Sequence, residues 1–110
     1  MEDQPQFLTR ERQTELFDIL HGGDSESSTL ALESIFKAYK TTVEKLVCWF
    51  CRADMETIKN DTLQVGYEIA IVTIKNYNPR TSAYALYTEL KNKIRSGLAN
   101  DRRKQDRRAE

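Results

Sequence analysis

The feature that most constrains the fold is a run from Leu32 to Phe50 in which apolar residues recur every three or four positions. This spacing places one apolar stripe along a helix, whereas a half-buried strand needs strict alternation. The stripe consists of Leu32, Ile35, Phe36, Tyr39, Val43, Leu46, Val47 and Phe50. Thr29 precedes the run and is a suitable N-cap residue. The sequence therefore predicts a long amphipathic helix that begins near Thr29.

Two further stripes follow along the chain. Asp54 is suited to cap a second helix that reaches about Ile74, and Thr81 or Ser82 is suited to cap a third. The second stripe consists of Ile58, Leu63, Tyr67, Ala70, Ile71 and Ile74, and the third of Ala83, Tyr87, Leu90, Ile94 and Leu98. Residues 69–74 are rich in β-branched side chains that also suit a strand. We favour a helix, because the stripe continues through them.

The turn residues support a helical fold class. The 110 residues include only 4 Gly and 2 Pro, too few for the frequent turns of a β-sandwich or barrel. A short helix is expected over residues 9–20, and the polar residues 24–28 after it are expected to form a flexible linker. The sequence thus predicts an all-α protein, a compact bundle of three long helices plus a short N-terminal helix. Its expected parts are an acidic extension (1–28), the bundle (29–104) and a charged tail (105–110).

Charge is separated along the chain, although the formal net charge is zero. Residues 1–34 contain 2 basic and 8 acidic residues, residues 35–74 contain 5 of each, and residues 75–110 contain 10 basic and 4 acidic residues. A basic end suits a phosphate-bearing partner, and an acidic front could screen that end within the same chain. The alternative is two solvated surfaces without a ligand.

The sequence gives no indication of membrane insertion, export or catalysis. The longest strongly apolar run, residues 69–74, is far shorter than the roughly 20 residues of a membrane-spanning helix. The N-terminus lacks the basic and apolar parts of a secretory signal. These features predict a cytoplasmic protein with no membrane partner. A single histidine and the absence of nucleophile or phosphate-loop motifs predict that it is not an enzyme and has no catalytic residue.

Cys48 and Cys51 have the CxxC spacing that occurs in zinc sites and in thiol-exchange proteins. A structural zinc ion normally needs four ligands, and His21 is the one other His or Cys in the chain. Both cysteines fall near the C-terminal end of the predicted first long helix, where the helix dipole does not favour a thiolate. We therefore expect free cysteines in ordinary packing, with no metal and no cofactor.

Aromatic and basic side chains are interleaved in the last third of the chain. Tyr77, Tyr84 and Tyr87 lie among Lys75, Arg80, Lys91, Lys93 and Arg95. Rings can stack on bases while cations hold phosphates, so the pattern is typical of proteins that bind single-stranded nucleic acid. Tyr87 also fits the predicted buried stripe, and a core role is equally open for Tyr77 and Tyr84. The predicted DNA-binding residues are Tyr84, Tyr87, Lys91, Lys93, Arg95, Arg102, Arg103 and Lys104.

Several elements together resemble region two of bacterial RNA polymerase sigma factors, particularly the extracytoplasmic-function group. The residues that carry the resemblance are Ile35-Phe36-Lys37-Ala38-Tyr39, Val43, Asp61-Thr62-Leu63-Gln64, Tyr67, Ala70, Tyr77-Asn78-Pro79 and Ser82. The match extends over about residues 32–103. It depends on the order and spacing of these elements more than on any one of them.

The resemblance implies a helical bundle that binds the clamp helices on the beta-prime subunit of core RNA polymerase. Such a domain then recognises and opens promoter DNA at the minus-ten element during transcription initiation. Asp61 and Gln64 match the polar polymerase-binding motif, and their spacing of three places them on one helical face. The alternative for this pair is a plain solvated face. An anti-sigma factor is a further partner that the resemblance allows.

The chain departs from the family pattern at several positions. Val65 stands at an acidic position of the family, and an ungapped alignment from Ser82 puts Leu86 at its tryptophan, Lys93 at its asparagine and Gly97 at its aspartate. Polymerase binding is thus better supported than a DNA sequence preference. The second DNA-binding domain of a complete factor is absent, so we expect a domain cut from a longer factor rather than a stand-alone protein. The competing hypothesis is a helical protein–protein interaction module without nucleic-acid binding.

Overall fold

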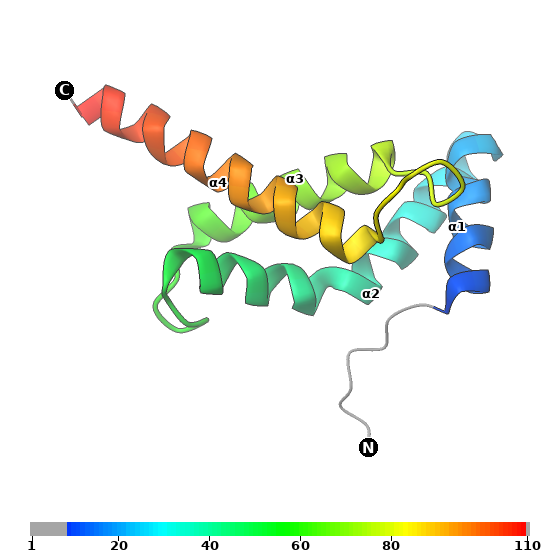
Figure 1. Cartoon of the computed structure of the whole chain (residues 1–110), viewed down its shortest axis with the longest axis horizontal. Coiled ribbons are helices and arrows are strands. Elements are labelled where there is room, and N and C mark those ends of the chain that lie inside the picture. Colours follow the sequence, from blue (N-terminus) through cyan, green and yellow to red (C-terminus); the bar gives the residue numbers. More distant parts are fainter. Residues whose placement is uncertain (1–8, 110) are drawn as a thin grey trace, which may run out of the picture.

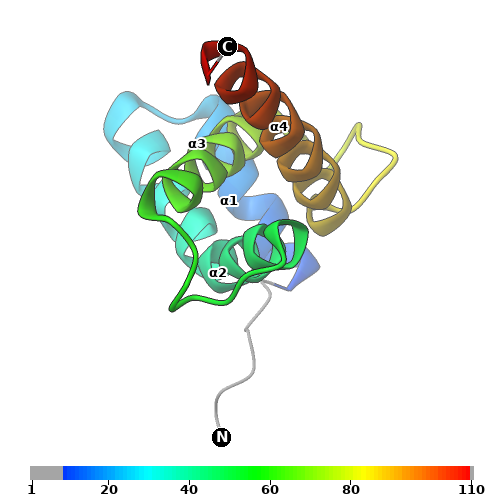
Figure 2. The ribbon, with the colours of Figure 1, turned by 90° about the vertical axis from the view of Figure 1, so that its left-hand side faces the viewer.

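Four helices account for most of the chain in the computed structural model, which describes residues 9–109, with side chains through residue 103. They are α1 (Arg10–Gly22), α2 (Ser25–Cys51), α3 (Asn60–Asn76) and α4 (Leu86–Ala109). The chain runs along α2, returns along α3 and turns back along α4, while α1 lies across one end of this bundle (Figure 1, Figure 2). No strand occurs within the described residues. The predicted all-α bundle with a short N-terminal helix is confirmed.

All four helices contribute apolar side chains to one core. Its buried members are Leu16, Phe17, Ala31, Ile35, Tyr39, Val43, Leu46, Val47, Leu63, Ala70, Ile74, Tyr77, Leu86, Leu90 and Ile94. The stripes predicted for α2 and α3 supply most of this set, and residues 69–74 are helical as favoured. Gly66 lets α3 approach α2 closely, because a Cβ atom at this position would overlap Cγ2 of Val47.

The predicted linker at residues 24–28 does not exist. Oδ1 of Asp24 accepts a hydrogen bond from the Ser27 N–H at 2.7 Å, and α2 begins at Ser25 rather than at Thr29. Gly23 ends α1 and Asp24 caps α2 directly, so the two helices are joined by a tight corner. Phe17 of α1 is 1% exposed and its ring meets that of Tyr77 edge-on at 5.2 Å. The described part of the N-terminal extension is therefore part of the core.

The second predicted helix begins later than expected. Oδ1 of Asp54 accepts from the backbone N–H groups of Glu56 and Thr57 at 3.0 and 2.9 Å, which closes a single turn. The backbone then becomes extended at Lys59, and α3 starts at Asn60. Asp54 is a cap, as predicted, but it caps a turn in the connection between α2 and α3. Its pKa is lowered from the usual value chiefly by hydrogen bonds from Thr57.

The third predicted helix also begins later, and its buried stripe is shifted. Ser82 closes a bend, because its hydroxyl accepts from the Tyr84 N–H at 3.2 Å, and the Tyr77 hydroxyl donates to the Tyr84 carbonyl at 2.8 Å. These bonds hold the segment outside a helix, so α4 begins only at Leu86. Leu86 is 1% exposed and takes the core position predicted for Tyr87, which is 42% exposed. Ala83, also predicted to be buried, is exposed.

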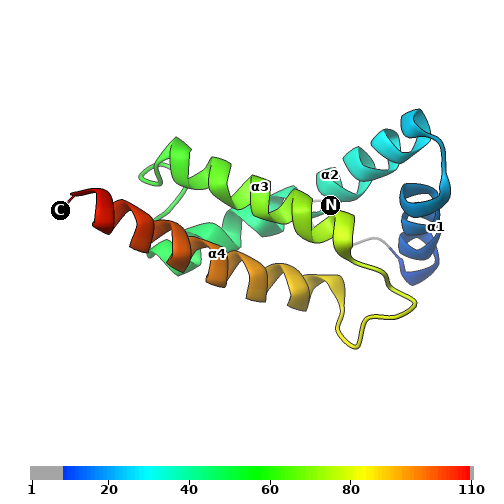
Figure 3. The same cartoon turned by 90° about the horizontal axis from the view of Figure 1, so that it is seen from above.

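The last helix extends well beyond its neighbours. Its backbone is helical through Ala109, so the predicted separate tail is, over residues 105–109, a continuation of α4. Its C-terminal turns project past the bundle at the end opposite α1 (Figure 3). Within the described residues, no helix is both long and apolar enough to cross a membrane.

Candidate functional site

The outward face of α3 carries the predicted polymerase-binding pair. Asp61 and Gln64 are both exposed, and their spacing puts them one turn apart on the same side of the helix. Glu68 continues this row one turn further and is exposed as well. Leu63 and Gly66 on the opposite side are buried against α2. The core thus fixes which way α3 faces, and the three polar side chains of the row are directed away from it.

Helix α4 separates the predicted cations onto two sides. Tyr87, Lys91, Arg95 and Arg102 share one side by their spacing, and we call this set the basic flank. Tyr87 lines a hollow together with Gln13 of α1 and Tyr39 of α2, and the Lys91 ammonium lies 5.7 Å from the centroid of the Trp49 ring. The basic flank therefore borders the α1–α2 side of the bundle at its start and continues onto the projecting turns.

The remaining predicted cations do not join the basic flank. Lys93 lines a hollow of about 460 Å³ on the α3 side of α4, together with Glu89 and Asn76. Arg103 is exposed but lies on a different side of α4 from Arg102, and the side chain of Lys104 lies outside the described ones. A single continuous surface that includes all the predicted DNA-binding residues is therefore not formed.

The two predicted base-stacking tyrosines are both available to a ligand. Tyr84 is 59% exposed and precedes α4, whereas Tyr87 is 42% exposed in its first turn. Tyr77, for which a core role was open, is buried, and burial is the main reason that its pKa is raised. The core role is thus assigned to Tyr77, and Tyr84 and Tyr87 remain on the surface.

Two departures from the sigma pattern have a structural reason. Leu86, at the position of the family's tryptophan, is buried in the core and cannot meet DNA. Gly97, at the position of its aspartate, faces Ile69 of α3, and a Cβ atom at residue 97 would overlap the end of that side chain. Both positions therefore serve helix packing in this chain.

Trp49 is a surface residue that the sequence patterns did not single out. Its ring is 64% exposed in the last turn of α2, beside Phe50 at a centroid distance of 5.0 Å. Phe50 fits the stripe of apolar residues spaced three and four apart, whereas Trp49 falls outside it. This position outside the stripe is the sequence signal that could have identified Trp49 as a surface residue. Its proximity to Lys91, by contrast, depends on how α2 and α4 pack.

The cysteines are free, and only one of them is packed. Cys48 is half-buried, and burial, followed by the charge of Asp54, raises the pKa of its thiol, which favours the protonated form. Cys51 is exposed, so the expectation of ordinary packing is wrong for this residue. Among the described residues, no three or more His, Cys, Asp or Glu side chains are grouped so that they could hold a metal ion.

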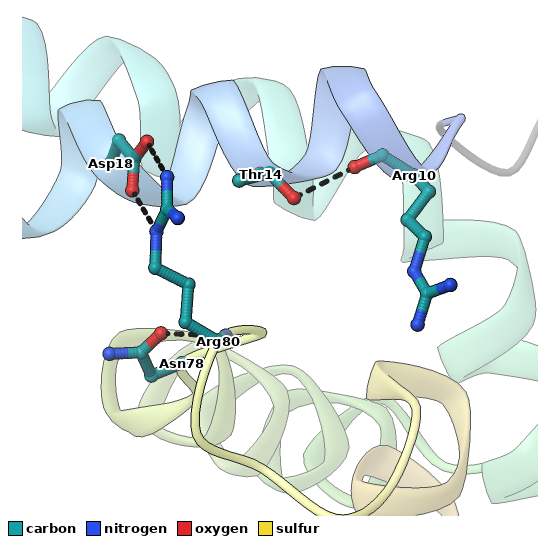
Figure 4. A network of polar contacts seen from close by, with 5 residues as sticks. All are labelled: Arg10, Thr14, Asp18, Asn78 and Arg80. Carbon is teal, nitrogen blue, oxygen red and sulfur yellow. Dashed lines mark hydrogen bonds and ion pairs between the residues drawn. The ribbon is translucent and has the colours of Figure 1, made fainter.

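The acidic front lies far from the basic end of α4 over its described part. Helix α1 is at the opposite end of the bundle from the projecting turns (Figure 1). An ion pair links α1 to the segment before α4: Arg80 donates to both carboxylate oxygens of Asp18, at 3.1 and 2.7 Å (Figure 4). Over the described residues, α1 thus contacts Arg80 and lies away from the projecting basic turns, and the part of the screening hypothesis that concerns residues 1–8 lies outside the described residues.

The chain was compared with models of protein families, with curated proteins and with solved structures. None of these three comparisons found a match.

Proposed function

We propose that this chain is a sigma region-two-like domain that binds core RNA polymerase through α3 and contacts promoter DNA through α4. The observation that carries the proposal is the joint exposure of Asp61 and Gln64 on one face of α3. The sigma-like motif requires this exposure, because a docking residue must be accessible while the helix is packed. Glu68 adds a carboxylate one turn beyond Gln64, which offsets the departure at Val65.

The basic flank supports the DNA part of the proposal. Lys and Arg side chains that neutralise phosphates give an affinity that falls with salt, and exposed rings can stack on bases that leave the duplex. The domain would therefore act by stabilising opened DNA and would not catalyse a reaction. Because Leu86 and Gly97 are used for packing, the proposal includes no particular promoter sequence. A cytoplasmic location and an anti-sigma partner belong to the same proposal.

Capture of core RNA polymerase tests the α3 face. Replacing Asp61 and Gln64 together with alanine should abolish capture of the polymerase by the tagged chain, because both polar contacts are lost. The far-ultraviolet circular dichroism should stay helical, since neither side chain is in the core. A matched control replaces Glu33 and Lys37, which are exposed one turn apart on α2, and should leave capture intact. Full capture by the Asp61/Gln64 variant would refute the assignment.

A protein–protein interaction module without a nucleic-acid role is the second candidate. One observation favours it: the apolar side chain of Val72 is exposed one turn beyond Glu68 on the outward face of α3. A face that combines carboxylates with an exposed valine suits many protein partners. Binding of a single-stranded DNA probe that weakens with added salt would exclude this candidate, and no binding at low salt would favour it.

A further inference from the structure

An exposed tryptophan at the end of α2 is not explained by the core. Trp49 is the only tryptophan in the chain, and its ring is 64% exposed although Leu46 and Val47 before it are buried. Aromatic side chains contribute most when they are buried, so a ring left in water gains little for the fold. The ring is therefore available to a ligand with an apolar, flat surface.

A cation from α4 lies over this ring, and two more stand within about one turn of Trp49 along the chain. The Lys91 ammonium of α4 lies over it at 5.7 Å from the centroid, within the range of a cation–π contact. Lys45 is exposed one turn before Trp49 on α2, and Arg52 follows the helix with a left-handed backbone, φ 53° and ψ 43°. A ligand that meets the ring would also meet the Lys91 ammonium, with Lys45 and Arg52 close by along the chain.

A hollow lies beside the ring at this end of the bundle. It has a volume of about 670 Å³ and is lined by Trp49, Phe50, Arg52, Ala53, Asp54 and Thr57. This size is within the range of small-ligand sites. Asp54 is the carboxylate among these lining residues, and the N–H groups of Glu56 and Thr57 donate to it and keep it ionised. The lining therefore carries Arg52 and Asp54 as opposite charges, and the excess of positive charge beside the ring comes from Lys91 and Lys45.

The basic flank extends the charge away from the hollow. Arg95 lies one turn beyond Lys91, roughly 6 Å along the helix axis, and Arg102 lies two turns further on the same side. At this point α4 runs past the end of α2, so the flank continues over the projecting turns (Figure 1, Figure 3). A linear polyanion could follow this line of cations from the Trp49 ring outward.

We propose that Trp49, Arg52 and Lys91, continued by Arg95 and Arg102, form a binding site for single-stranded DNA. The Trp49 ring stacks on one base, and the cations hold the phosphates on either side of it. A duplex does not fit the site equally well, because its bases are already stacked on one another and present only their edges. The site deepens the DNA part of the proposed function and is independent of polymerase binding.

Intrinsic fluorescence tests the stacking contact directly, because a single tryptophan supplies the signal. Titrating the full chain with a short oligodeoxythymidylate should quench Trp49, and the matching duplex should bind more weakly. Trp49→Ala should weaken binding of a labelled oligonucleotide by about 5- to 150-fold, as expected for the loss of one stacked base. Trp49→Phe keeps a ring and should retain most of the affinity. Lys91→Gln should reduce the slope of log affinity against log salt by roughly 0.7.

Two matched variants control for nonspecific effects. Leu30→Ala removes a side chain that is 58% exposed near the other end of α2, and Lys75→Gln removes an exposed cation from α3. Both should bind the oligonucleotide as the parent chain does. Absence of quenching, an unchanged affinity in Trp49→Ala, or tighter binding of the duplex would each overturn the site.

The oligonucleotide-binding assay and the polymerase-capture assay can fail independently of each other. DNA binding that does not depend on Trp49 would overturn this site and leave the DNA contact of α4 standing. Polymerase capture should be unchanged in Trp49→Ala, because the ring is on α2 and the Asp61–Gln64 face is on α3. Capture that persists without Asp61 and Gln64 would refute polymerase docking and leave the Trp49 site standing.

Discussion

Replacing Gly66 with alanine should destabilise the bundle through one overlap between α2 and α3. The added Cβ would collide with Cγ2 of Val47, a side chain with no exposed surface. A β-branched side chain is stiff at χ1, so Val47 cannot rotate away, and overpacking of this kind costs about 1–3 kcal/mol. We take the upper part of that range and subtract about 1 kcal/mol for the better helix propensity of alanine. The expected net loss is about 2 kcal/mol.

Gly97→Ala is the matched comparison. The Cβ there would overlap Cδ1 of the half-buried Ile69, which can turn away about its outer bond, and would lie 3.0 Å from Cγ1, a tight contact that needs a small shift of that side chain. The propensity gain of about 1 kcal/mol should then be offset only in part, so this variant should be as stable as the parent or slightly more stable. The two glycines are thus expected to differ in the sign of the effect.

Urea unfolding followed by circular dichroism measures both effects. With a slope of about 2 kcal/mol/M, Gly66→Ala should lower the midpoint by about 1 M, and Gly97→Ala should not lower it. Val47→Ala removes the methyl group that the added Cβ atom would meet. The variant that combines it with Gly66→Ala should therefore be about 1 kcal/mol more stable than the sum of the two single effects implies. A Gly66→Ala midpoint at or above that of the parent, or strictly additive costs in the double variant, would refute this account of the α2–α3 contact.

Two pKa shifts give further predictions. Burial, followed by the hydrogen bond that the hydroxyl donates to Glu44, raises the pKa of Tyr67 to about 12. The protonated Tyr67 hydroxyl should contribute its full stabilisation below about pH 10, and this contribution should be lost as the pH rises toward 12. In a near-ultraviolet absorbance titration, Tyr67→Phe should lack the tyrosine step that occurs at the highest pH. Hydrogen bonds from Arg80 lower the pKa of Asp18, so Arg80→Gln should raise that pKa toward the usual value in an NMR titration. The Asp18–Arg80 ion pair should stabilise the fold at pH values above the unfolded-state pKa of Asp18. This stabilisation should be lost as the pH falls through the folded-state pKa of Asp18. An unchanged Asp18 titration in Arg80→Gln would contradict the pairing.

Helix boundaries show where local patterns stopped being sufficient. Asp54 and Ser82 each have the chemistry of a cap, and each does close a turn. Whether a capped turn continues into a helix depends on what the following residues pack against, and this is not a local property. Lys59 and Ala85, which directly precede α3 and α4, gave no capping signal because neither side chain can cap a helix.

The choice between Leu86 and Tyr87 shows a second limit. Both stand at helical spacing from Leu90, so two overlapping stripes fit the same sequence. Rotation of α4 against the bundle decides between them, and it buries Leu86 and leaves Tyr87 at the surface. The same rotation directs Lys91 toward α2 and Lys93 toward α3.

The sequence by itself determined the fold class, the stripes of α2 and α3 and the polar pair on one face of α3, because all of these follow from spacing within a single helix. It also located the basic end of the chain. Only the tertiary structure decided that α1 belongs to the core and that Lys91 lies over Trp49. Such contacts join residues distant along the chain, and they depend on how helices rotate and pack, which no local spacing encodes.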